Sequence, residues 1–216
     1  MEKSPLQLNE EVFSLLDTSS MNHSLLITVI FIYIQLFHYI EGHGMVLEPV
    51  ARGSRWRYNE SAPRNYNDAE LYCGGRTVQW NQNNGKCGIC GDNFAESRPR
   101  RHEIGGEFGE PVIVGAYKRK SILTSRIDIT ANHKGKFWFE LCNMDGRKNE
   151  AEECFNTKML TKFDDEFWYL KSNESKIFDV ELKVPDIKCQ HCIFRWNWST
   201  GNNWGDCGNG TGAVGC

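Results

Sequence analysis

Long apolar runs are scarce in this chain of 216 residues, and this argues against a membrane-spanning helix. The longest run, Leu25 to Ile40, is shorter than the ~20 apolar residues that a membrane-spanning helix needs. Thr28, Gln35 and His38 interrupt it. The run has about the length of the apolar part of a signal peptide, and Gly42 offers a small residue just before a cut.

Residues 1–42 are therefore interpreted as an N-terminal extension and a cleaved signal peptide. No Lys or Arg lies between Met21 and the apolar run, so Met21 could be the true start of the protein. We expect residues 43–216 to form the mature, secreted domain, with His43 as its first residue. An uncleaved leader would instead give a membrane-anchored or inert structural protein.

Net charge is also low, and this argues against charged partners. Residues 1–42 hold five acidic residues and one basic residue, which leaves 23 acidic and 24 basic residues in 43–216. A domain near +1 gives no reason to expect a nucleic acid or an anionic membrane as partner. It suits a neutral substrate.

Several motifs of common enzyme classes are missing. The sequence has no Gly-rich phosphate loop, no nucleophile elbow, no internal repeat and no low-complexity tract. Glu103 and Glu107 could form the carboxylate pair of a glycoside hydrolase, but no spacing fixes their separation. We interpret both as solvated loop charges. His102 follows three arginines and is interpreted as part of a solvated basic loop.

Cysteine, in contrast, is abundant, and every cysteine follows the leader. The nine are Cys73, Cys87, Cys90, Cys142, Cys154, Cys189, Cys192, Cys207 and Cys216. In an exported chain such usage indicates a disulfide framework, with eight cysteines paired and one free or intermolecular. The pairs Cys142–Cys154 and Cys207–Cys216 would enclose short loops and are our candidates; the other connectivities stay open.

Zinc is the alternative use of these cysteines. Cys87/Cys90 and Cys189/Cys192 are Cys-x-x-Cys pairs of the kind found in zinc knuckles. Their separation is about a hundred residues, whereas zinc pairs usually lie about 15–20 residues apart. Disulfides are therefore favoured.

Four Asn-x-Ser/Thr triplets agree with export, because they are acceptors for N-linked glycans. They begin at Asn59, Asn173, Asn197 and Asn209. Such triplets also occur by chance, and we expect only about half of them to be used.

The body of the chain alternates apolar and polar residues, as half-buried strands do. Strands are predicted at 111–117, 125–130, 136–142, 178–184 and 194–198. No stretch has a convincing helical period, and the long connections 52–111 and 143–176 are rich in Gly, Asn and Pro. The sequence thus predicts an all-β fold, an immunoglobulin/fibronectin-like antiparallel β-sandwich with long disulfide-bonded loops.

Two histidines form the candidate metal site. An N-terminal His43 would offer both its α-amine and its ring, and His133 lies in a short predicted turn at 131–135. Three nitrogens in one plane favour Cu(II). From spacing alone, the alternative is that His133 is an ordinary turn residue and His43 an accident of cleavage.

Motifs along the whole of 43–216 carry a family resemblance. They include His43-Gly-Met-Val-Leu-Glu-Pro, Asn65-Tyr-Asn-Asp-Ala-Glu-Leu-Tyr-Cys-Gly-Gly, Cys87-Gly-Ile-Cys-Gly-Asp, Arg100-Arg-His-Glu-Ile-Gly-Gly-Glu, Thr130-Ala-Asn-His and Trp204-Gly-Asp-Cys. In order and spacing, the sequence resembles the lytic polysaccharide monooxygenases of auxiliary activity family fifteen, within the chitin-binding type-4 domains.

The resemblance implies a function. His43 and His133 match the copper ligands and the catalytic site, Tyr66 matches an aromatic residue of the polysaccharide-binding face, and Ala131 matches a small residue beside the copper. The implied enzyme oxidatively cleaves chitin or cellulose with copper, O2 or hydrogen peroxide, and an external reductant. We expect a monomer without a nucleic-acid or membrane partner after cleavage.

One departure from the family pattern concerns the C-terminus. Relatives continue past the final Gly-Cys with another cysteine, an aromatic residue at the copper's axial position and a last strand, whereas this sequence stops at Cys216. We therefore expect an incomplete domain in which the last strand is missing. The alternative function is a non-catalytic chitin-binding protein whose redox site is impaired.

Overall fold

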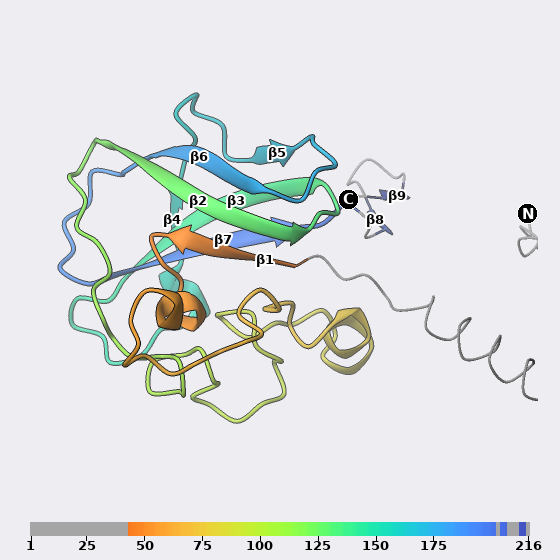
Figure 1. Cartoon of the computed structure of the whole chain (residues 1–216), viewed down its shortest axis with the longest axis horizontal. Coiled ribbons are helices and arrows are strands. Elements are labelled where there is room, and N and C mark those ends of the chain that lie inside the picture. Colours follow the sequence, from red (N-terminus) through yellow and green to blue (C-terminus); the bar gives the residue numbers. More distant parts are fainter. Residues whose placement is uncertain (1–42, 202–203, 207–211, 215–216) are drawn as a thin grey trace, which may run out of the picture. The chain divides into compact units, whose positions relative to one another are not determined.

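The computed structural model describes residues 43–201, 204–206 and 212–214, and in it two antiparallel sheets face each other (Figure 1). The first sheet has the order β1-β2-β6. In the second, β3 pairs with β4 and β5, and β7 also pairs with β3. The strands are β1 (His43–Glu48), β2 (Ile122–Ala131), β3 (Gly135–Asn143), β4 (Thr157–Met159), β5 (Trp168–Leu170), β6 (Ile177–Lys183) and β7 (Cys192–Ser199). In addition, β8 (Trp204–Asp206) pairs antiparallel with β9 (Gly212–Val214).

This architecture confirms the predicted all-β sandwich. Four predicted strands correspond to β2, β3, β6 and β7, with ends displaced by at most three residues. The alternation of residues in these strands separates a buried face from an outer face, as predicted. In β3, Phe137 and Phe139 are almost fully buried, whereas Trp138 between them is half-buried and lies on the other face.

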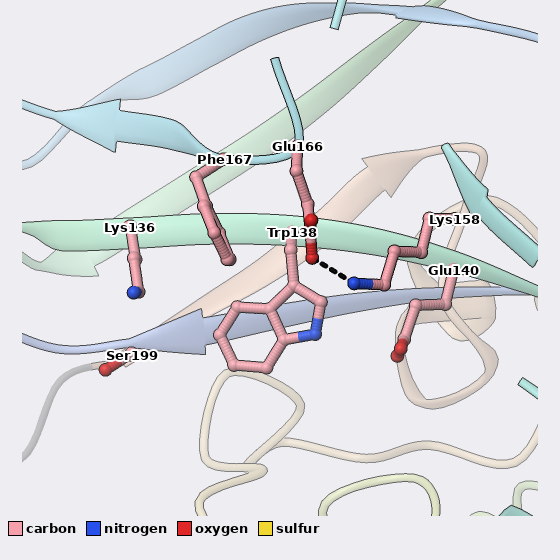
Figure 2. A pocket seen from close by; sticks show the side chains of 7 residues that line it. All are labelled: Lys136, Trp138, Glu140, Lys158, Glu166, Phe167 and Ser199. Carbon is pink, nitrogen blue, oxygen red and sulfur yellow. Dashed lines mark hydrogen bonds and ion pairs between the residues drawn. The ribbon is translucent and has the colours of Figure 1, made fainter. Parts of the chain in front are cut away.

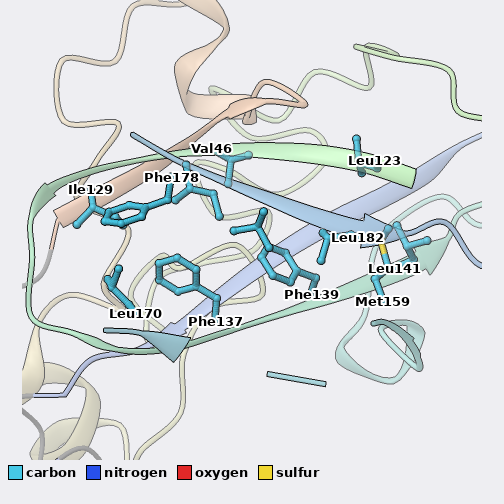
Figure 3. Packing of buried hydrophobic residues seen from close by; sticks show 12 residues of the cluster. Val46, Leu123, Ile129, Phe137, Phe139, Leu141, Met159, Leu170, Phe178 and Leu182 are labelled. Atoms are coloured by element: carbon cyan, nitrogen blue, oxygen red, sulfur yellow. The ribbon is translucent and has the colours of Figure 1, made fainter. Parts of the chain in front are cut away.

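The core lies between the two sheets and draws on nearly every strand (Figure 3). Its buried members are Val46, Leu123, Ile127, Ile129, Phe137, Phe139, Leu141, Met159, Leu170, Phe178, Val180 and Leu182. Trp196 and Trp198 of β7 pack against it. Each large apolar side chain buried here contributes about 1.5–3 kcal/mol, so the sandwich is a rigid base for its loops.

Helical structure in the described residues is limited to three short turns. They are η3 (Arg52–Arg57), η4 (Thr77–Gln82) and η5 (Glu152–Cys154). None of the helices that the structure describes is long or apolar enough to span a bilayer. The connection from η3 to β2 is otherwise irregular, as the Gly- and Asn-rich sequence predicted.

The predicted strand at 111–117 is wrong. These residues belong to none of the strands that the structure describes, and Val112, Ile113 and Val114 are 49%, 56% and 44% exposed. Three consecutive apolar residues have no period of two, so their apolar character alone did not define a buried face. The strand of this region begins instead at Ile122.

Three disulfides replace the zinc alternative. Cys142–Cys154 pairs as predicted, and Cys189–Cys192 closes one of the two Cys-x-x-Cys motifs. Cys87 pairs with Cys73 and not with Cys90. The candidate pair Cys207–Cys216 lies outside the described residues.

Cys90 is the one free cysteine among the described residues. Burial raises the pKa of its thiol to about 12, although the positive charge of Arg52 opposes this shift. The Arg52 Nη1 lies 3.4 Å from the Cys90 sulfur. A buried, protonated thiol is a poor nucleophile.

We therefore expect Cys90 to resist alkylation by iodoacetamide at pH 8 in the folded protein and to react once the protein is unfolded. Mass spectrometry of the labelled peptides measures this. Rapid labelling before unfolding would contradict the buried position. No labelling after unfolding without reductant would show that Cys90 is in a disulfide.

Candidate functional site

Strand pairing brings the two candidate histidines to one end of the sandwich. His43 is the first residue of β1 and pairs with Ala131, the last residue of β2. His133 follows two residues later, in the turn between β2 and β3 that the sequence predicted. Ala131 is half-buried, lies opposite His43 in the register and precedes His133 by two residues.

The turn that carries His133 is held firmly. The Asn132 side chain donates to the carbonyl oxygens of Ser172 and Glu174, and its oxygen accepts from the Lys134 amide at 2.7 Å. The carbonyl oxygen of His133 accepts from the Gly201 amide at 2.8 Å. The backbone of the turn is therefore fixed on both sides.

The His133 ring has an unused nitrogen. Its Nε2 atom is buried and has no hydrogen-bond partner in the part of the chain that the structure describes. Buried polar atoms are nearly always bonded, so an orphaned ring nitrogen calls for a ligand. A metal ion would satisfy it.

His43 is positioned by a neighbouring loop. Its ring stacks on Tyr72 with centroids 5.9 Å apart and planes 22° apart. The next amide, of Gly44, donates to the Ala69 carbonyl oxygen at 3.0 Å. A Cβ atom at Gly44 would lie 2.8 Å from Ile129 Cδ1 and 3.1 Å from the Asp128 carbonyl oxygen, so a larger residue here would require its neighbours to shift.

Side chains alone do not complete a metal site here. Across residues 43–201 and strands β8 and β9, no group of three or more His, Cys, Asp or Glu side chains converges. Two histidines with one further nitrogen, the amine of a mature N-terminus, would make the donor set. Such nitrogen ligands fit Cu(II).

Tyr66 lies on the surface, which excludes the core role that its aromatic ring could have had. It is 71% exposed. Its ring meets Trp56 edge to face at 5.3 Å, and its hydroxyl accepts from Arg64 at 3.3 Å. A large exposed ring of this kind offers a flat apolar face to a ligand.

A buried hydrogen-bond chain behind Tyr66 was not foreseen. His102 is 4% exposed, so its interpretation as a solvated loop residue is wrong. The Asn65 oxygen accepts from the Asn67 amide, so its Nδ2 faces His102 Nε2 at 3.2 Å. The opposite ring nitrogen, Nδ1, then donates to Asp92 at 2.6 Å. This chain fixes Asn65, the residue before Tyr66.

Glu103 is also buried, at 1% exposure, which contradicts its predicted solvation. It accepts from Arg98 at 2.8 Å and from Arg100 at 2.5 Å. Burial alone would raise the pKa of Glu103, but the two guanidinium groups outweigh it and hold the pKa below its ordinary value. Glu107 is exposed and pairs with Arg101, so the two glutamates serve different ion pairs and form no catalytic dyad.

A further ion pair joins this loop to another one. Arg52 Nη1 lies 2.5 Å from Glu150 Oε1, which also accepts from the Ile104 amide at 3.0 Å. The burial of these charges could have been predicted from one feature of the sequence. Arg, Glu and His are frequent in this segment, which has no apolar periodicity. Such a segment has few apolar side chains to bury and is held by polar bonds instead.

The fold and the paired histidines define the class of protein. The family model described as "Lytic polysaccharide mono-oxygenase, cellulose-degrading" matches residues 43–208. The chain therefore belongs to the lytic polysaccharide monooxygenases. This confirms the enzyme class and the cofactor expected from the sequence, a copper-dependent monooxygenase.

A similar solved structure is that of an enzyme of auxiliary activity family fifteen. The lytic polysaccharide monooxygenase AA15 from Thermobia domestica in the Cu(I) state is 38% identical, with a TM-score of 0.76. The match covers 81% of this chain and 91% of that chain. Among curated proteins, none matches the chain significantly.

Proposed function

We propose that the protein is exported, starts at His43 after cleavage, and oxidatively cleaves chitin or cellulose with a copper ion held by His43 and His133. The single observation that carries the site is the orphaned Nε2 of His133 at the end of the sandwich where β1 begins. The family match also begins at residue 43. Three disulfides support an oxidising, extracellular destination.

Several groups of the chain have separate roles in this proposed site. Cleavage before His43 frees an α-amine, which joins the rings of His43 and His133 as the third nitrogen donor. When bound and reduced, copper supplies activation of O2 or hydrogen peroxide and removal of hydrogen from a glycosidic carbon. Tyr72 orients the His43 ring, and the small side chain of Ala131 leaves room beside the site. The protein thus contributes ligand geometry and substrate placement.

The test has two parts. N-terminal sequencing of the secreted protein should yield His43; a start upstream of it would remove the amine donor. The copper-loaded protein with a reductant should release oxidised oligosaccharides from chitin or cellulose. Binding without oxidised products would favour the alternative, a non-catalytic chitin-binding protein.

Tyr66 should bind the polysaccharide through its exposed ring. We expect Tyr66→Ala to weaken adsorption to the insoluble substrate about tenfold, because truncating a contact residue of this kind costs on the order of 1–2 kcal/mol. Copper affinity should stay unchanged. Adsorption isotherms measure the first quantity and calorimetry the second. Tyr117→Ala, at another exposed tyrosine, is the matched control; an equal loss there would deny Tyr66 a specific role.

A further inference from the structure

The outer face of β3 carries an aromatic residue where the alternation calls for a polar one. Lys136, Trp138 and Glu140 all point away from the core. Trp138 meets Phe167 edge to face at 6.4 Å. Figure 2 shows the pocket that these side chains line, together with Lys158, Glu166 and Ser199. Its volume of about 370 Å³ lies at the lower end of the range for small-molecule sites.

Charges around the pocket balance. Lys158 is paired with Glu166, and Glu140 accepts from Arg195 at 2.8 Å. The ammonium of Lys136 lies 4.3 Å from the centre of the Phe167 ring. A pocket with an aromatic wall and paired charges on its rim suits a neutral ligand with both apolar and hydroxyl faces.

An N-glycan acceptor triplet borders this pocket. Asn197 is directly opposite Trp138 in the β3–β7 register, and its Nδ2 donates to Glu140 Oε2 at 2.8 Å. Ser199, the hydroxyl residue of the same triplet, lines the pocket itself. Trp198 between them packs on the core side. Both required residues of the triplet thus face outward beside the aromatic wall.

We propose that an N-linked glycan on Asn197 occupies this pocket, with its first sugar packed against Trp138. The proposal rests on the proposed export of the protein. In the modification, the Asn197 amide nitrogen displaces a lipid-linked diphosphate from the anomeric carbon of the donor sugar. A C–N bond forms, the C–O bond breaks, and the amide loses one proton.

Two structural features agree with this modification. The substituted amide keeps one N–H, which can still donate a hydrogen bond to Glu140. Transfer takes place on the chain as it is exported, before β7 forms, so the half-buried position of Asn197 does not prevent it. The finished sugar covers the exposed part of Trp138, as an apolar pyranose face can cover an indole ring.

The other glycan-acceptor asparagines that the structure describes do not border this pocket. Asn59 and Asn173 are exposed, and neither contributes to this pocket. The Asn59 oxygen accepts from the amide and hydroxyl of Ser61. Glycans at these two positions would project into solvent, which makes them internal controls for export and for enzyme access.

The experiment uses the full chain secreted from a eukaryotic host. Peptide mapping should find glycan on Asn197, and native treatment with a peptide N-glycosidase should release it at least about tenfold more slowly than the glycan of Asn173. Trp138→Ala should abolish this protection. An unoccupied Asn197 beside an occupied Asn59 or Asn173 would overturn the proposal and leave export standing. Secreted protein with no occupied site would overturn the proposal alone, whereas failure of the chain to enter the medium would overturn export and the proposal together.

A matched pair of variants separates the glycan from the asparagine. Ser199→Ala removes the acceptor triplet but keeps the Asn197 bond to Glu140, and Ser199→Thr keeps both. Ser199→Ala should lower Tm by about 2–4 °C, the range for loss of one moderate contact in a domain of this size, and Ser199→Thr should not. Trp138→Ala should lower Tm less in the Ser199→Ala background than alone. Equal Tm values for all forms, or binding of a soluble chitin oligosaccharide to this pocket in the natively glycosylated protein, would overturn the proposal.

Discussion

Copper affinity should fall by at least about 100-fold when His133 is replaced by Ala in the protein that begins at His43. Even indirect supporting residues of metal sites change affinity by about 10–100-fold, and this substitution removes a proposed ligand itself. The fold should survive, because His133 lies in a turn whose backbone bonds come from Asn132 and Gly201. Calorimetric titration with Cu(II) measures the affinity.

One added residue before His43 should have an effect of similar size. It converts the α-amine into an amide, which binds the metal far less well near neutral pH. Affinity should also fall as the pH is lowered, because protons compete for the amine and both rings. His191→Ala, at a histidine beside the Cys189–Cys192 disulfide, is the matched control and should bind copper normally. Equal affinities in all four proteins would place the metal elsewhere.

Removing the Glu103 carboxylate should destabilise the protein by about 3–5 kcal/mol, the usual cost of breaking a buried ion pair from one side. Glu103→Ala leaves Arg100, whose side chain is 6% exposed, without its carboxylate partner. Chemical denaturation measures the change in the free energy of unfolding. Glu107→Ala, in an exposed pair with Arg101, is the matched control and should cost at most about 1 kcal/mol. Equal losses in the two variants would contradict the assigned burial.

The Glu103 carboxylate should also make the stability of the folded protein depend on pH. The pKa of Glu103 is lower in the folded protein than its ordinary value. The contribution of Glu103 to the free energy of unfolding is therefore fully present above the ordinary pKa of a glutamate. It is lost as the pH falls through the lower pKa that Glu103 has in the folded protein. The wild type should lose stability in this acidic range, and Glu103→Ala should lose less. Parallel pH profiles would show that Glu103 is not responsible.

Features that depend on neighbouring residues in the sequence could be predicted, whereas features that depend on contacts between distant segments could not. The faces of β3 and β7 were predictable, because alternation between Phe137, Trp138 and Phe139 is a local pattern. The short strand β1 was missed, because its six residues take their strand character from pairing with β2. His102 and Glu103 were misplaced, because their partners form only when distant loops meet.

The candidate site was predictable in part for the same reason. His43 and His133 stand out through the predicted cleavage point and a local turn motif, and the structure places both at one end of the sandwich. Sequence could not show that the Nε2 of His133 lacks a partner, because that depends on every neighbour in space. Nor could it show that Trp138 faces Asn197, which is a matter of strand register.

The position of β1 at the edge of its sheet also bears on how this enzyme could diversify. Among the described strands only β2 pairs with β1, and on the other side of β1 the Gly44 amide donates to the Ala69 carbonyl oxygen. The loop that displays Tyr66 thus also fastens the segment that carries His43. Insertions within the exposed residues 58–61 can change this surface at little cost, whereas a shift of Ala69 would reach His43, the proposed metal ligand, through the Gly44 amide. The surface beside Tyr66 and the geometry of the proposed ligand can therefore vary separately in residues 58–61, and they are linked at Ala69.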